Sequence, residues 1–427
     1  MGRLSTEIVT PVVPTTSGRR ARVVGIVFLV VGIVIFLWFA LGTQAGVQTR
    51  FGLNPTRGTT FLNLPDIVVP SQATLFVIAA ICAFAGGYQL AKGFGHRVNL
   101  ALGLVAFLLV IAFLIWAAAD GSLSLLGMLQ STVLRSVPIA FAALSGVLCE
   151  RSGVINIGIE GMLLSGAFAG AVAASITHSL WAGLFAGAAV GGLVAALLAV
   201  LAIRYLVDQI VAGTVINILA LGLTSYLSKQ YLEQNQALND PGRFQNFAIP
   251  VLSRIPFVGP ILFDNNIFVY LLFLIVAATH IGLFYTRWGL RVRAVGEHPT
   301  AADTVGIRVI FTRYRNVILG GVVAGIGGAY FTLGAVGRFE EGMSAGRGFI
   351  GLAAMIFGRW KPIGALYAAL IFGFADSLQV KANILQVSIP TEFLAMLPYI
   401  VTILIVAGAA HRVRPPAADG KPYIKQR

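Results

Sequence analysis

The sequence predicts an all-α polytopic membrane protein with about 11–12 membrane segments, one of them a short half-helix. Hydrophobic residues make up 57% of the 427 residues, charged residues make up only 11%, and the mean hydropathy is +0.87. A soluble domain of this length has too little interior for so many apolar side chains. These side chains also fall into runs of about 20 residues, the length that a helix needs to cross a membrane.

The apolar runs give the predicted elements in chain order. One run, 348–358, is about half as long as the others and predicts either a half-helix or the short arm of a bent helix. Small residues recur every four positions in several runs, as in Gly183, Gly187 and Gly191, and this spacing lets helices approach closely in lipid. Full-length spans are expected at 23–43, 72–91, 98–118, 123–147, 161–177, 181–203, 209–228, 266–286, 315–335, 362–380 and 393–410.

The positive charges predict the orientation of these spans. The net charge of +14 comes from Lys and Arg residues that lie mostly in short connections, which favours a topological role over nucleic-acid binding. If the spans alternate, most of these residues and both chain termini are cytoplasmic, whereas Arg338 and Arg347 are among the exceptions outside. The cytoplasmic set is Arg19, Arg20, Arg22, Lys92, Arg97, Arg204, Arg287, Arg291, Arg293, Arg308, Arg313, Arg315, His411, Arg412 and Arg414.

A polar break, Glu150–Gly161, separates two of the predicted spans. In hydrocarbon, charges and irregular backbone are tolerated only where protein or a watery cavity surrounds them. One interpretation is a cytoplasmic turn that contains Glu150 and Arg151, with Glu160 near the N-terminus of the next helix. A second interpretation places part of the break within the membrane, beside a transport path. The residues that would then line the path are Asn156, Gly158 and Glu160.

Asp376 is a further candidate for the path. It lies inside the predicted span 362–380, and an acidic residue within a span usually faces the bundle interior or a cavity. A structural carboxylate held by hydrogen bonds is the alternative interpretation. Arg135 and Pro138 are the other polar or bending features within a span.

The connection Thr286–Arg315 contains more than a charge anchor. It mixes apolar, Gly and Pro positions with its arginines, which favours a compact docking surface on the cytoplasmic side. Its segment Pro299–Asp303 predicts the start of a short helix, because Pro is tolerated in a first turn. A helix that lies on the membrane surface is the alternative.

Motifs for catalysis are absent from the sequence. It contains no phosphate-binding loop, no H-E-x-x-H motif and no paired Cys or His residues at metal-binding spacing. We therefore expect no catalytic residue, no metal site and no cofactor. The segment Gly342–Gly346 fits G-x-S-x-G, but it precedes the half-helix instead of lying between a strand and a helix, so it predicts an external turn.

The break and the connection together carry a resemblance to a known family. The run Glu150–Gly166 resembles the signature of permease subunits of bacterial ABC importers for simple sugars, branched-chain amino acids and nucleosides, and it is most similar to the nucleoside branch. The loop Leu290–Ile307 is similar to the segment by which these permeases meet their ATPase. The resemblance implies a cytoplasmic tail at 1–22, two accessory spans in 23–97, a permease core of about ten helices in 98–410 and a cytoplasmic tail at 411–427.

What the resemblance implies about function is uptake of nucleosides across the bacterial cytoplasmic membrane, with ATP hydrolysis on a partner protein. The implied partners are a cytoplasmic ABC ATPase, a related or identical second permease, an external substrate-binding lipoprotein and membrane lipid. A ribose-like sugar permease and an ion-gradient-driven carrier or channel are the alternatives, although a carrier more often needs several intramembrane carboxylates. The residues that the resemblance assigns to ATPase coupling are Ala294, Gly296, Glu297, Pro299, Ala301, Ala302 and Gly306.

Overall fold

The protein is an all-α polytopic membrane protein, as the sequence predicts. In the computed structural model, ten helices of the described residues are long and apolar enough to cross a membrane, and they coincide with the predicted spans from 23–43 to 362–380. The expected span at 393–410 lies outside the described residues except for three positions, so it stays a prediction. The structure describes residues 17–55, 60–387, 389–390, 393–394, 396 and 414–425.

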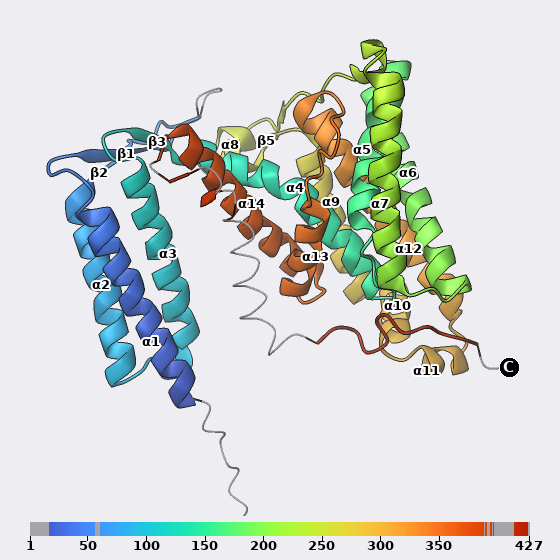
Figure 1. The fold of residues 1–427 in the computed structure, drawn as a ribbon, viewed down its shortest axis with the longest axis horizontal. Helices are drawn as coiled ribbons and strands as arrows, with labels where there is room; N and C mark the ends of the chain where they lie inside the picture. The colour runs from blue at the N-terminus through green and yellow to red at the C-terminus, as the bar shows by residue number, and fades with distance from the viewer. Residues whose placement is uncertain are drawn as a thin grey trace, which may run out of the picture. The chain divides into compact units, whose positions relative to one another are not determined.

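The chain forms two compact units, and the first contains Met1–Leu53 and Leu64–Leu125. It is a bundle of three helices with a small sheet of order β2-β1-β3, in which β1 is antiparallel to β2 and parallel to β3 (Figure 1). The third helix belongs to this unit, whereas the functional division predicted after residue 97 stays a prediction. The elements are α1 (Ser17–Val34, continued by a π-helical turn), β1 (Gln48–Gly52), β2 (Ile67–Pro70), α2 (Ser71–Ala91), α3 (Val98–Ala117) and β3 (Ser122–Ser124).

The second unit contains Asn54–Asn63 and Leu126–Arg427 and holds the polar break. Its predicted half-helix is present as α13, a separate helix that precedes α14. The helices and strands are α4 (Leu125–Glu150), α5 (Ile159–Thr177), α6 (Leu180–Ala199), α7 (Gln209–Leu227), β4 (Phe247–Ala248), α8 (Val258–Leu262), β5 (Asp264–Asn265), α9 (Ile267–Tyr285), α10 (Arg287–Glu297), α11 (Pro299–Thr304), α12 (Val309–Ala329), α13 (Arg347–Phe357) and α14 (Pro362–Ile384).

Helices α5, α6 and α12 pack through the small residues that recur every four positions (Figure 1). A Cβ atom on Gly166 would lie 2.7 Å from the Gly325 backbone, and one on Gly187 would lie 2.8 Å from the Gly166 carbonyl oxygen. A Cβ on Gly191 would overlap the Gly321 carbonyl oxygen. The three helix backbones therefore touch each other directly, which confirms the close approach predicted from the glycine spacing.

Helix α4 runs through the interior of the second unit, and nearly all of its residues from Thr132 to Glu150 are buried. Pro138 lies inside this helix and has no N–H to donate to the carbonyl of Leu134. The Tyr330 hydroxyl donates to that carbonyl oxygen at 2.8 Å instead. The helix thus keeps its freed backbone acceptor satisfied.

We expect Gly325→Ala to destabilise the protein, because the added methyl group would meet the backbone of Gly187 on α6. Overpacking of this kind costs about 1–3 kcal/mol. Gly222→Ala on α7 is the matched control, since nothing lies within 4 Å of its Cβ position. Thermal unfolding followed by size-exclusion chromatography should show a lower transition for Gly325→Ala alone, and equal transitions for the two variants would contradict the packing described here.

Candidate functional site

The polar break is an irregular segment between α4, which ends at Glu150, and α5, which begins at Ile159. The end of α4 meets the turn that follows α13. The Trp360 indole donates to the Glu150 carboxylate at 2.6 Å, and the Arg151 guanidinium donates to the Trp360 carbonyl oxygen at 2.9 Å. Glu150 and Arg151 therefore lie in a tight turn, as the first interpretation of the break predicts.

Residues 155–161 run along α7, which supplies the hydrogen bonds that the irregular backbone lacks. The Gln209 side chain accepts from the Ile155 amide at 2.7 Å. The Asn217 side chain donates to the Ile157 carbonyl oxygen at 2.9 Å and accepts from the Gly161 amide at 2.8 Å. A Cβ on Gly213, which lies between these two side chains on α7, would be 2.8 Å from the Gly158 nitrogen. The break is thus enclosed by protein.

Glu160 caps the N-terminus of the half-helix α13. One carboxylate oxygen accepts from the Gly346 amide at 2.7 Å, and the other accepts from the Gly348 amide at 2.6 Å. Both N–H groups lie at the positive end of the helix dipole, where a carboxylate is stabilising. Gly348 has to be small, because a Cβ there would lie 2.6 Å from a Glu160 carboxylate oxygen. The sequence predicts Glu160 near the N-terminus of its own helix, α5, and the structure shows that it also binds the N-terminus of α13.

The length of α13 sets the depth of Glu160. The helix has 11 residues, so it is about 16 Å long at 1.5 Å per residue. Glu160 lies at its first turn, and Glu150 lies beside Trp360 just after its last turn. If Glu150 is at the membrane surface, Glu160 is about halfway through a hydrocarbon core of about 30 Å.

Asn156 and Gly158 are buried inside this segment. The Asn156 amide nitrogen lies 3.4 Å from the Cys149 sulfur and 3.5 Å from the Met162 sulfur. Its side-chain oxygen is buried and has no hydrogen-bond partner among the described residues. In this conformation Asn156 therefore faces protein, and its place beside the transport path stays a prediction.

Asp376 on α14 lies between two arginines from other helices. Its carboxylate is 2.9 Å from Arg135 on α4 and 3.7 Å from Arg347, the first residue of α13. The three side chains retain 17%, 31% and 26% exposure respectively, so this cluster borders open space. The Arg347 guanidinium also lies over the Phe331 ring, 5.7 Å from its centroid.

Arg347 brings the two predicted acidic residues together. Glu160 binds the amides on either side of it, and Asp376 faces its side chain. Sequence reasoning counted Arg347 as an external charge and missed this role. The available signal was its position directly before the predicted half-helix 348–358.

The predicted coupling residues form α10, α11 and the turn after them. Pro299 opens α11, as expected, and Gly306 adopts a φ of +84° in the following turn. Gly296 packs so tightly on the Arg151 backbone that a Cβ would overlap the Arg151 carbonyl oxygen. Ala302 is buried, whereas Ala301 and Glu297 are exposed and Ala294 is half-buried. Helix α10, which carries three of the predicted coupling residues, is therefore in direct contact with the polar break.

The C-terminal segment 414–425 packs on the same helices. The Ala418 amide donates to the Gly296 carbonyl oxygen at 2.9 Å, and the Ala417 amide donates to the Glu297 carboxylate at 3.1 Å. Tyr423 packs with the buried residues Val295, Ala302 and Val309. Sequence reasoning treated this segment as a tail, and the structure shows that its described residues join α10, α11 and the start of α12.

Asp419 in this segment interacts with two buried charged residues, Glu150 and Arg313. Burial raises the pKa of the Asp419 carboxyl to about 6, although Glu150, the Gly420 backbone and Arg313 each lower it. Arg313 donates to the Lys421 carbonyl oxygen at 3.0 Å. The cytoplasmic side predicted for Arg313 stays a prediction, and the structure adds that this residue is buried and holds the C-terminal segment.

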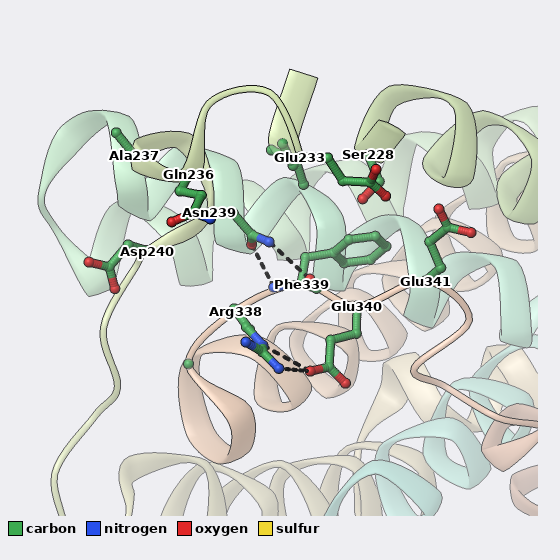
Figure 2. A pocket seen from close by; sticks show the side chains of 12 residues that line it. Ser228, Glu233, Gln236, Ala237, Asn239, Asp240, Arg338, Phe339, Glu340 and Glu341 are labelled. Carbon is green, nitrogen blue, oxygen red and sulfur yellow. Dashed lines mark hydrogen bonds and ion pairs between the residues drawn. The ribbon is translucent and has the colours of Figure 1, made fainter. Parts of the chain in front are cut away.

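A hollow of about 720 Å³ lies between the segment that follows α7 and the segment that follows α12, and no sequence pattern predicts it (Figure 2). The Asn239 side chain exchanges two hydrogen bonds with the Phe339 backbone, at 2.6 and 3.0 Å, and Arg338 pairs with Glu340 at 2.7 Å. Acidic side chains outnumber the single basic one, Arg338, among the charged residues that line the hollow. They are Glu233, Asp240, Glu340 and Glu341.

The comparisons with known proteins define the class first: residues 128–406 match the family described as "branched-chain amino acid transport system / permease component", and the chain belongs to this family. Over 304 residues it is 40% identical to the guanosine ABC transporter permease protein NupQ of Bacillus subtilis (strain 168), covering 69% of this chain and 95% of the relative. Over 305 residues it is 39% identical to the nucleoside ABC transporter permease protein NupC of Lactococcus lactis subsp. cremoris (strain MG1363), covering 69% and 96%.

A third relative carries a different substrate name. The putative glucose ABC transporter permease protein TsgC13 of Haloferax volcanii is 31% identical over 308 residues, which cover 67% of this chain and 92% of the relative. No solved structure matches the chain. The family resemblance stated from the break and the loop is thus confirmed, and the nucleoside relatives are more similar than the sugar relative.

The raised pKa of Asp419 predicts a pH dependence for the C-terminal segment. Because the folded pKa lies above that of an unfolded Asp, about 3.9, the contribution of this carboxyl to docking is full below about pH 4 and is lost as the pH rises to about 6. Hydrogen exchange of residues 414–425 should therefore be faster at pH 7 than at pH 5 after correction for intrinsic rates. Asp419→Asn should reduce this difference, and an unchanged difference would contradict the assignment.

Proposed function

We propose that this chain is the permease subunit of an ATP-driven ABC importer that moves nucleosides across the bacterial cell membrane. The observation that carries the proposal is the similarity to two nucleoside permeases over 95% and 96% of their lengths. Permease subunits of this kind are not themselves enzymes. They work with a partner ATPase and another permease subunit, and we place ATP hydrolysis on the ATPase.

The finer features of the proposal follow from the same family. An external substrate-binding lipoprotein would deliver the nucleoside, and both termini would lie in the cytoplasm, on the side where the arginine-rich connections collect. The alternative cargo is a simple sugar, since one relative is named for glucose. The two more similar relatives are named for guanosine and for nucleosides, which favours a nucleoside cargo.

We assign the path to Glu160 and Asp376, with Asn156 and Gly158 in the enclosed segment behind them. The side chains of Arg135, Asp376 and Arg347 are partly exposed, so they can offer donors and acceptors to a neutral, polar cargo. The Phe331 ring beside Arg347 offers a face for stacking. Weak contacts of this kind suit a transport path, because a tightly bound cargo would not leave.

Coupling would run through contacts that the structure contains. Gly296 on α10 touches the Arg151 backbone, and Arg151 donates to the turn after α13 at Trp360. The other end of α13 holds Glu160 and presents Arg347 to Asp376. A displacement of α10 and α11 by the ATPase would therefore tilt α13 as a short lever and change the surroundings of both acidic residues.

The path assignment predicts that Glu160→Gln reduces nucleoside uptake. The amide would lose one of two charge-assisted hydrogen bonds, each contributing about 1.5–3 kcal/mol, which corresponds to a decrease of roughly tenfold or more. Glu233→Gln, which changes an exposed residue that lines the hollow of Figure 2, is the matched control. Uptake of labelled nucleoside by cells that contain equal amounts of each variant measures the effect. Equal uptake by both would remove Glu160 from the path.

The coupling assignment predicts that Gly296→Val separates ATP hydrolysis from transport. The valine side chain would push α10 away from the Arg151 backbone, so the reconstituted importer should lose substrate-stimulated ATPase activity while membrane insertion continues. Glu297→Gln is the milder change at the same site, because it weakens the bond from Ala417 and the attraction to Arg151 without pushing the two backbones apart. If both variants keep normal substrate stimulation, α10 is not the coupling element.

A further inference from the structure

A second hollow lies where α10, α11 and α12 meet, and its rim is strongly basic. It encloses about 680 Å³ and contains no acidic residue in its lining. Among the described residues, no ion pair joins its arginines to a carboxylate. We call it the arginine hollow, and its arginines are Arg287, Arg291, Arg308 and Arg315.

The same hollow is partly apolar. Leu290, Val305 and Phe311 line it and retain 62%, 76% and 60% exposure. The Arg315 guanidinium lies 5.7 Å from the centroid of the Phe311 ring and 5.6 Å from that of Trp288. The surface therefore combines positive charge with uncovered hydrocarbon, a combination that suits a ligand with an anionic head and an apolar tail.

The position of the hollow along the helices fits such a ligand. The membrane-spanning helix α9 ends at Tyr285, and α12 begins at Val309, so Arg287 and Arg308 lie just beyond the ends of two spans. Phosphate groups of lipids occupy this depth. On α12, Phe311, Arg315 and Leu319 follow each other at four-residue spacing and are all exposed, so they extend the surface from the hollow along the helix.

We propose that the arginine hollow binds an anionic phospholipid. The guanidinium groups would hold the phosphate with forked hydrogen bonds, and an acyl chain would lie against Leu290 and Phe311. Gly306, one of the proposed coupling residues, also lines the hollow, and an acidic segment of the partner ATPase would satisfy the arginines equally well. It would leave Phe311 and the exposed residues that follow it on a membrane-spanning helix without a role, which is why the observations favour a lipid.

The test uses the full-length chain, purified in detergent and examined by native mass spectrometry with added phosphatidylglycerol or phosphatidylcholine. We expect the wild-type chain to retain phosphatidylglycerol in preference to phosphatidylcholine. The double variant Arg291→Gln/Arg308→Gln should retain phosphatidylglycerol about tenfold more weakly. The control, Arg243→Gln/Arg254→Gln, removes the same charge from exposed positions outside the hollow and should retain it like the wild type. Equal size-exclusion profiles of the double variant and the wild type would show that the double variant is folded. If they differ, the single variant Arg291→Gln is used instead.

Three outcomes would overturn the proposal. In the first, the hollow variant and the control bind phosphatidylglycerol equally. In the second, inorganic phosphate displaces the lipid completely at equal concentration, which would reduce the site to a phosphate site. In the third, the hollow variant keeps the lipid and loses a copurifying ATPase, which would make the hollow a protein-docking surface.

Discussion

The second unit depends on one constraint: backbone that is not helical has to find its hydrogen bonds within the protein when lipid surrounds it. The segment between α4 and α5 meets this constraint with side chains of α7, because Gln209 and Asn217 bind two of its backbone groups and one in the first turn of α5. Helix α13 meets the same constraint differently: the Glu160 carboxylate accepts from the free amides at the start of this helix. The polar residues named here therefore have a structural role first: they supply the hydrogen bonds that an interrupted helix needs within a membrane.

The glycines serve the same interior. Gly166, Gly191 and Gly325 let α5, α6 and α12 touch at the backbone. Gly296 allows an equally close contact between α10 and Arg151. Close contacts of this kind transmit displacement, because a packed backbone cannot absorb a shift as a long side chain can.

The sequence predicts the spans well, since apolar length alone decides them, and the half-helix at 348–358 agrees with α13 within a residue. It does not predict contacts between distant residues. Arg135 and Asp376 are 241 positions apart, and nothing local indicates that they pair. The same holds for Arg313 and the C-terminal segment. One signal was present and was missed: Gln209, Gly213 and Asn217 recur every four residues at the start of a span, which marks a polar face on α7.

The charges within the candidate path bear on which kind of transporter this is. Arg135 and Arg347 balance Asp376 and Glu160, so the cluster carries no net formal charge. Glu160 is held by two backbone amides and Asp376 by guanidinium groups. A carrier driven by an ion gradient needs a carboxylate that can exchange its partner for a proton or a cation, and here both acidic residues already have strong partners. A neutral, polar cargo that is moved by the tilting of a helix fits this arrangement better, because its passage requires no change in protonation.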